Sequence, residues 1–171
     1  MLLWHLGTAA LIVYVSLGRR RIDYRMILVG ALLPDVVDGL LGLFFFDGPA
    51  GRWIAHSIFA AIAVTVLIIL VFRGDRRQSL FGIGVGWLLH LVADGMWQGP
   101  ATFLWPAFGW GFSDSPGEPY SWELFLDPIA HLTTWGGELI GFAILAWFWV
   151  AFRLGQAGRL RLFLSDGYLR P

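Results

Sequence analysis

The sequence predicts an all-α polytopic membrane protein, a helical bundle of about five transmembrane helices, and three observations support this fold class. Of the 171 residues, 57% are hydrophobic and only 14% are charged, whereas a soluble domain is about 45–50% apolar and ~25% charged. The hydrophobic residues form long stretches, and the arginines are distributed unevenly between these stretches. No Gly-X-Y or heptad repeat is present, so collagen-like and coiled-coil chains are excluded, and the high apolar content excludes disorder.

Five segments approach the roughly 20 apolar residues that a helix needs to cross the hydrocarbon core of a bilayer. We expect these spans at 2–17, 26–46, 53–72, 80–97 and 129–152. The first span is short, but basic residues follow it and do not precede it, so we interpret it as a mature helix and not as a signal peptide. Residues 1–152 then form one transmembrane domain with an outer loop at 98–128, and residues 153–171 form a basic cytoplasmic tail.

The arginines indicate how the chain is oriented. All 12 lysine and arginine residues are arginines, and all except Arg52 follow the first, third or fifth expected span. Because cytoplasmic loops carry the excess of basic residues, this asymmetry predicts an outer N-terminus and a cytoplasmic C-terminus. The formal net charge is zero, which gives no reason to expect a nucleic-acid partner.

Two segments outside the spans also carry structural signals. The outer loop at 98–128 is long and rich in Trp, Phe, Gly and Pro, and we expect it to lie on the outer interface as a lid or re-entrant segment. Arginine and leucine alternate at 159–162, which fits either a helix on the inner membrane surface or a frayed basic tail. Within the spans, glycines at i and i+4 predict close helix packing. These glycines are Gly82 with Gly86 and Gly137 with Gly141.

Ionisable residues are frequent inside the expected spans, although a charge at the centre of a bilayer costs at least about 2.5 kcal/mol and such residues usually face the bundle interior. In three cases two of them share a helix face, because they are three or four positions apart. These pairs are Asp35 with Asp38, His90 with Asp94, and Asp127 with His131. His5, His56 and Glu138 complete the set. Pro34 should kink its helix and present the neighbouring aspartates to a cavity, so we predict that the set converges on one cavity open to the outer side.

The chemistry of this set favours a divalent metal. Imidazoles and carboxylates suit Zn²⁺, Mn²⁺ or Fe²⁺, and the absence of cysteine excludes thiolate sites, disulfides and cysteine nucleophiles. Metals about 3.5–4 Å apart can activate water and stabilise in-line displacement at phosphorus. Structural interpretations remain open for single residues. A membrane histidine can be a helix-packing hydrogen bonder, Asp127 an N-cap, Glu138 a partner for a neighbouring helix, and Arg52 an interfacial residue.

Several motifs of this chain resemble those of the YdjM-like family of bacterial inner-membrane, metal-dependent hydrolases. They are Leu-Leu-Pro-Asp ending at Asp35, Asp38 after it, Arg52 followed by His56-Ser57, His90-Leu-Val-Ala-Asp94, and Phe-Leu-Trp-Pro at 103–106. His5 matches an N-terminal histidine of the family pattern, and the resemblance covers residues 1–110. It implies an all-helical metal site similar to those of zinc-dependent phospholipase C and P1 nuclease. The metal ligands that it implies are His5, Asp35, His56, His90 and Asp94, with Asp38 as a further match.

The chain departs from the family pattern around two of these motifs. Val37 stands where the family has an acidic residue, and Gly51, Trp53 and Ala55 replace family residues around Arg52 and His56. A lost ligand could be replaced from beyond the matched region. The candidates for that replacement are Asp127, His131 and Glu138.

We therefore expect a membrane-embedded hydrolase that holds one to three divalent metals, Zn first and Mn or Fe as alternatives. A metal-activated water would attack a phosphoester, with Asp38 or Glu138 as general base and Arg52 pairing with the phosphate. A lipid phosphoester in the surrounding membrane is the expected substrate class, and the membrane lipids are the expected partners. The alternatives are a proton- or ion-coupled transporter and a non-catalytic module with a structural metal.

Overall fold

The structure is a computed structural model that describes residues 1–17, 22–45, 51–112 and 132–170. The described residues form α-helices and short 3-10 helices and include no β-strand, which agrees with the predicted all-α class. The elements are α1 (Leu2–Leu17), α2 (Tyr24–Phe45), η1 (Ile54–His56), α3 (Ile58–Val71), α4 (Gly74–Ala93), η2 (Met96–Gln98), α5 (Pro100–Phe103), α7 (Leu132–Ala151) and α8 (Ala157–Asp166).

Two of the described helices, α2 and α7, are long and apolar enough to cross a membrane, judged by length and composition. Helices α1 and α3 are apolar but shorter. Helix α4 begins with a charged turn that contains Asp75, Arg76 and Arg77. The helices therefore lie close to the five expected spans, and two of them meet both the length and the hydropathy expected of a membrane-crossing helix.

The third and fourth expected spans differ from the observed helices at their ends. Residues 53–57 are not part of α3, because Ser57 has an extended backbone and its hydroxyl accepts a hydrogen bond from the Ala60 amide as an N-cap. Helix α4 starts six residues earlier than expected, at Gly74, and ends at Ala93. The left-handed backbone of Gly95 (φ 62°) terminates it, as glycine commonly does after a helix.

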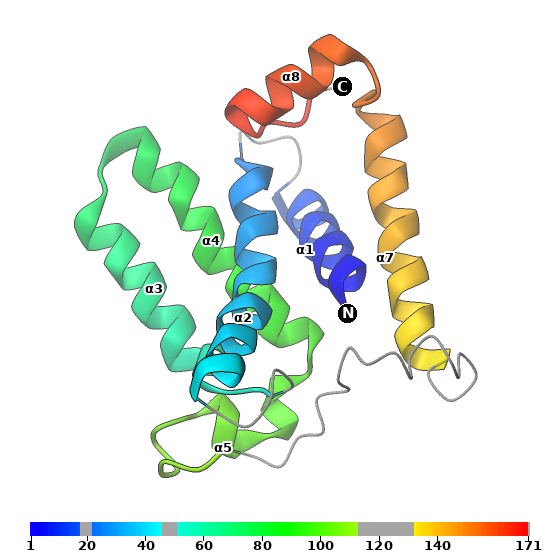
Figure 1. The fold of residues 1–171 in the computed structure, drawn as a ribbon. Coiled ribbons are helices and arrows are strands. Elements are labelled where there is room, and N and C mark those ends of the chain that lie inside the picture. Colours follow the sequence, from blue (N-terminus) through cyan, green and yellow to red (C-terminus); the bar gives the residue numbers. More distant parts are fainter. Residues whose placement is uncertain (18–21, 46–50, 113–131, 171) are drawn as a thin grey trace.

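Helix α2 lies at the centre of the arrangement, between α4 and α1 (Figure 1). Helix α3 packs on the outer side of α4, and α7 packs against α1. Glycine makes two of the close helix approaches possible. A Cβ atom at Gly86 would lie 2.1 Å from the carbonyl oxygen of Ile27, and one at Gly141 would lie 2.2 Å from that of Leu3. The predicted close packing at these two glycines is confirmed.

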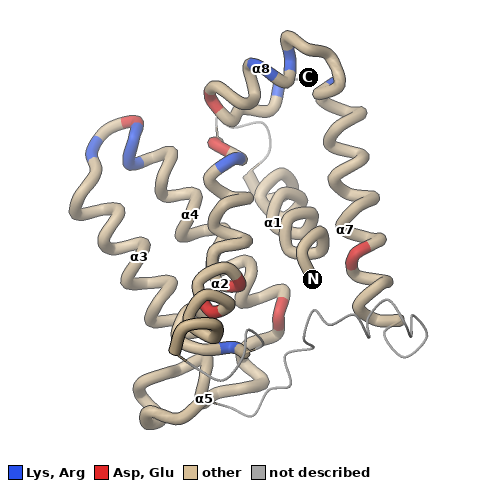
Figure 2. Tube along the Cα trace, viewed as in Figure 1, with Lys and Arg blue, Asp and Glu red and all other residues tan. Residues whose placement is uncertain are grey.

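The C-terminal tail is a helix that folds back onto the start of α2. The Tyr24 amide donates to the Gly167 carbonyl at 2.9 Å, and Arg25 Nη1 donates to the Leu164 carbonyl at 2.8 Å. Of the two interpretations of the tail, the structure therefore excludes the frayed one. Most of the arginine residues marked in Figure 2 lie at the α8 end of the molecule, on α8 and at the turn between α3 and α4.

The buried Asp23 holds together the segments that meet at the α8 end of the molecule. Its side chain accepts hydrogen bonds from Arg25, at 2.9 and 2.8 Å, and from the Ser79 hydroxyl. Burial raises the pKa of the Asp23 carboxyl, but the hydrogen bonds from Arg25 and Ser79 and the charge of Arg25 outweigh burial, so this pKa lies below its ordinary value of 3.8.

We expect Asp23 to stabilise the fold in a pH-dependent way. A carboxyl whose pKa is lowered on folding contributes stability above its unfolded pKa, and that contribution is lost as the pH falls through the folded pKa. The wild type should melt at a higher temperature than Asp23→Asn. This difference in melting temperature should be largest above about pH 4 and should decrease as the pH falls below that value. Thermal unfolding of both proteins in detergent across this range measures the effect. A difference that does not change with pH would contradict it.

Candidate metal centre

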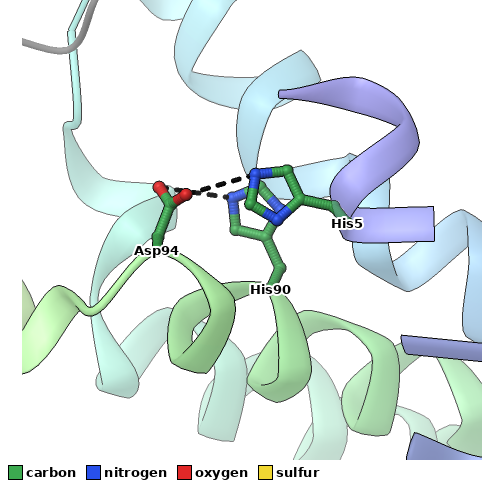
Figure 3. Close-up of side chains that lie close together, drawn as sticks. All are labelled: His5, His90 and Asp94. Carbon is green, nitrogen blue, oxygen red and sulfur yellow. Dashed lines mark ion pairs between the residues drawn. The ribbon is translucent and has the colours of Figure 1, made fainter. Parts of the chain in front are cut away.

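Two groups of side chains with metal-ligating atoms come together where α1, α2 and α4 meet, and both groups include His90. The first contains His5, His90 and Asp94, and the second contains Asp35, His56 and His90. Within each group the ligand atoms lie within 4.8 Å of one another. Figure 3 shows how the rings of His5, from α1, and His90, from α4, point toward the Asp94 carboxylate. The three histidines are each at most 2% exposed.

His56 is held by a carboxylate that lies behind it. Its Nδ1 is 2.6 Å from Asp38 Oδ2, and Asp38 is itself buried. The two oxygens of Asp38 also accept hydrogen bonds from the backbone amides of Trp53 (2.6 Å), Ala55 (2.9 Å) and His56 (3.2 Å). Asp38 therefore fixes the 3-10 helix η1 and the His56 ring to α2.

The sequence predicts a metal ligand or general base at Asp38. In the structure both of its oxygens accept hydrogen bonds and are turned toward η1, and Asp38 belongs to neither ligand group of the described residues. Asp38 instead orients an imidazole, the relation that commonly holds a metal-binding histidine in one tautomer.

His90 is oriented in the same way by a backbone carbonyl. Its Nδ1 lies 2.7 Å from the carbonyl oxygen of Ala31, and because a carbonyl can only accept, this Nδ1 carries the proton. Asp38 likewise accepts from Nδ1 of His56, so in each neutral ring Nε2 keeps its lone pair. The two Nε2 atoms face each other at 3.2 Å. Facing lone pairs repel, so this geometry needs a proton or a metal cation between them.

The nearest carboxylate oxygens complete a four-atom set around this position. Asp35 Oδ1 is 3.5 Å from His56 Nε2 and 3.6 Å from His90 Nε2. Asp94 Oδ2 is 3.6 Å and 3.9 Å from the same two nitrogens. Tetrahedral ligands bound at 2.0–2.1 Å would be about 3.3 Å apart. These separations and the nitrogen and oxygen donors therefore fit a divalent transition metal.

Because both ligand groups include His90, they cannot each bind a metal ion through three ligands at the same time. Nδ1 of this ring is engaged by Ala31, so only one lone pair, on Nε2, is free. One lone pair binds one ion. The two groups therefore describe a single centre that uses His90 once, and not two complete three-ligand sites.

His5 and Arg52 contact this centre through Asp94. His5 Nε2 is 3.2 Å from Asp94 Oδ1, and its ring stacks on that of His90 with centroids 4.0 Å apart. No group among the described residues hydrogen-bonds the buried Nδ1 of His5. Arg52 Nη2 is 2.8 Å from Asp94 Oδ2. The side chains of Asp35 and Arg52 are 38% and 28% exposed, so they form the accessible edge of the cluster.

The structure places the other predicted site residues elsewhere or does not describe them. Glu138 Oε2 accepts a hydrogen bond from the Leu3 amide at 2.7 Å, which ties α7 to α1, and Glu138 belongs to neither ligand group of the described residues. Asp127 and His131 lie outside the described residues, as does the second half of the predicted outer loop. The first half of that loop begins at the last residue of η2 and contains α5.

The role of Asp38 leads to a testable prediction. Asp38→Asn keeps the shape of the side chain but turns an NH₂ group toward amide donors, so it should release η1 and the His56 ring. Loss of such an orienting group typically weakens metal affinity by about 10–100-fold. Zinc titration of the detergent-purified variant measures this affinity, and Asp166→Asn on α8 is the matched control. An unchanged affinity would contradict the positioning role.

Comparison with known proteins gives one match. A family model described as YdjM inner membrane protein matches residues 2–160 of this chain. No curated protein and no solved structure matches it. The match covers the described helices up to the start of α8 and includes every residue of the candidate metal centre.

Proposed function

The chain belongs to the YdjM inner membrane protein family, and from that premise we propose that it is a membrane-embedded, metal-dependent hydrolase that acts on a phosphoester. One observation carries the proposal. His56 Nε2 and His90 Nε2 face each other at 3.2 Å, with the carboxylates of Asp35 and Asp94 beside them. Such a buried set of nitrogen and oxygen donors is a binding site for a divalent metal.

The proposed topology has five membrane-crossing helices, with an outer N-terminus and a cytoplasmic C-terminus. The family name and the two long apolar helices support a membrane location. The arginines at the α8 end support the orientation, since basic residues concentrate on the cytoplasmic side. Helix α3 has 14 residues and is about 21 Å long at 1.5 Å per residue, so the bilayer would thin or the flanking residues would extend the span. The metal centre then lies toward the outer face.

The residues of the metal centre would have different roles in the proposed reaction. A bound divalent ion would supply Lewis-acid activation of water and of a phosphoryl oxygen. Asp38 and the Ala31 carbonyl keep the two imidazoles in the tautomer that offers Nε2. A catalytic ion would need an open position for water, so three residues of the set would hold it: His56, His90 and Asp94. Asp35, the most exposed carboxylate of the cluster, would then accept the proton from that water. Asp38 and Glu138 already accept hydrogen bonds from backbone amides.

We propose that Arg52 binds the substrate phosphate. Its guanidinium lies at the accessible edge and pairs with Asp94, and its planar donors match phosphate oxygens. A bound metal would share the negative charge of Asp94 and so weaken the attraction that holds Arg52. The guanidinium would then be available to an anionic phosphoester.

Hydrolysis of membrane phosphoesters by the metal-loaded protein tests the proposal. We expect phosphate or headgroup release from a panel of phospholipids and polyprenyl phosphates, and loss of release when the metal is chelated. Arg52→Gln should raise KM more than it lowers kcat, because Arg52 binds the phosphate, while Arg161→Gln on α8 should change neither. Absence of turnover by metal-loaded protein across the panel would contradict the hydrolase proposal.

A structural metal is the second candidate function. The almost complete burial of His5, His56 and His90 favours it, because structural metal sites are closed to solvent. Under this alternative the metal raises the melting temperature, and the same loaded protein shows no turnover on any substrate of the panel.

A further inference from the structure

A cavity lies at the end of the bundle opposite to the metal centre. It has a volume of about 600 Å³ and is lined by residues of α1, α2, α3 and α4 and by Tyr168, which follows α8. The metal centre uses the last turn of α4 and the middle of α2, whereas this cavity uses the first turns of both helices. The volume falls in the range of about 300–1,000 Å³ that is typical of small-molecule sites.

The lining of this cavity has a buried apolar part and an exposed polar part. Val13 and Ile27 are buried apolar residues of the lining, and Val85 is half-buried. Arg77 and Gln78 are exposed polar residues of the lining, so they mark its mouth. A cavity with these two parts suits an amphiphile whose hydrocarbon chain enters between the helices while its polar headgroup stays at the mouth.

The charge at the mouth indicates which headgroup fits. Arg77 lines the cavity, and Arg73 and Arg76 belong to the same turn, where Arg76 lies over the Phe72 ring at 5.0 Å. Two acidic residues also line it. Asp23 is already paired with Arg25 and hydrogen-bonded by Ser79. Asp75 shares its turn with Arg73, Arg76 and Arg77, so the turn beside the cavity carries a net positive charge, which favours an anionic headgroup.

We propose that this cavity binds one anionic phospholipid of the surrounding membrane, with an acyl chain between α1, α2 and α4 and the phosphate at Arg77. The site is separate from the metal centre and does not depend on the proposed hydrolase activity. Basic pockets between membrane helices are known to bind acidic lipid headgroups. The lipid would fill a cavity that α8 and Tyr168 border, and so would support the docking of the tail onto α2.

Native mass spectrometry of delipidated, detergent-purified protein tests the site. The protein is titrated with phosphatidylglycerol and, separately, with phosphatidylcholine of the same acyl chains. We expect tighter binding of phosphatidylglycerol, and about fivefold weaker binding of this lipid to Arg77→Gln, the effect of one basic residue near an anionic lipid. Arg161→Gln, an exposed arginine on α8, is the matched control and should bind phosphatidylglycerol as the wild type does.

A second variant tests the apolar part of the cavity. Val85→Phe places an aromatic ring in the cavity and should weaken the binding of both lipids. Arg77→Gln should weaken the binding of phosphatidylglycerol alone. Arg77 is an exposed surface residue, so its variant keeps the test valid if Val85→Phe does not fold. Equal affinity for the two lipids, or phosphatidylglycerol binding that is the same in Arg77→Gln and Arg161→Gln, would overturn the proposal.

Discussion

Replacement of His90 by alanine is expected to abolish stoichiometric metal binding. His90 belongs to both ligand groups, and its Nε2 faces that of His56 at 3.2 Å. Removing the ring takes away a ligand, which should weaken affinity by more than the roughly 10–100-fold that loss of an orienting group causes. Metal content after zinc repletion and desalting, measured by mass spectrometry, should fall from one equivalent to background.

The control for this experiment must separate ligand loss from destabilisation. His90→Ala also leaves the Ala31 carbonyl without its partner, which costs about 1–3 kcal/mol. Leu91→Ala is the matched variant, because Leu91 is 2% exposed, adjoins His90 and loses about 2–5 kcal/mol of core packing without removing a ligand. Leu91→Ala should melt earlier and still bind one metal. Full metal binding by a folded His90→Ala protein would contradict the assigned site.

Replacement of Gly86 by valine is expected to have the largest effect on the fold. A Cβ at this position would lie 2.1 Å from the Ile27 carbonyl oxygen and 2.8 Å from the Ala31 amide nitrogen. Both contacts are with the backbone of α2, so no side-chain rotation can relieve them and the two helices must separate. Overpacking of a core commonly costs about 1–3 kcal/mol, and a backbone clash should exceed that range.

Size-exclusion chromatography and thermal unfolding in detergent measure the effect of Gly86→Val. We expect little folded protein, because α2 and α4 form the most extensive helix pair in the described structure and carry Asp35, His90 and Asp94. Gly136→Val on α7 is the control, since a Cβ at Gly136 meets no atom within 4 Å. A Gly86→Val protein that melts like Gly136→Val would show that the helices are not packed as described.

Helix periodicity and the cost of charge in a membrane were enough to predict most of the cluster. His5, Asp35, His56 and the pair His90 and Asp94 come from four helical segments, and the structure brings their side chains together. The bounds of α1 also agree with the first expected span, since apolar residues run from one end of it to the other.

Contacts between segments distant in sequence could not be predicted in the same way. The spacing of Asp35 and Asp38 predicts a shared helix face, but the roles of the two residues differ because η1 presents three amides to Asp38. The pairing of Arg52 with Asp94 depends on how the chain after α2 returns to α4. The third expected span begins at residue 53, before the start of α3, because apolar residues continue through η1. The Ser57 cap that starts the helix is a weak signal in the sequence compared with this apolar stretch.

The metal content of the wild-type protein tests the central claim most directly. The protein is purified in detergent, repleted separately with zinc, manganese and iron, and analysed by mass spectrometry and by X-ray absorption of the bound metal. We predict one equivalent of one of these metals, with a coordination shell of nitrogen and oxygen that includes two imidazoles. A folded protein that retains none of the three metals would contradict the account, because the facing nitrogens of His56 and His90 would then share only a proton.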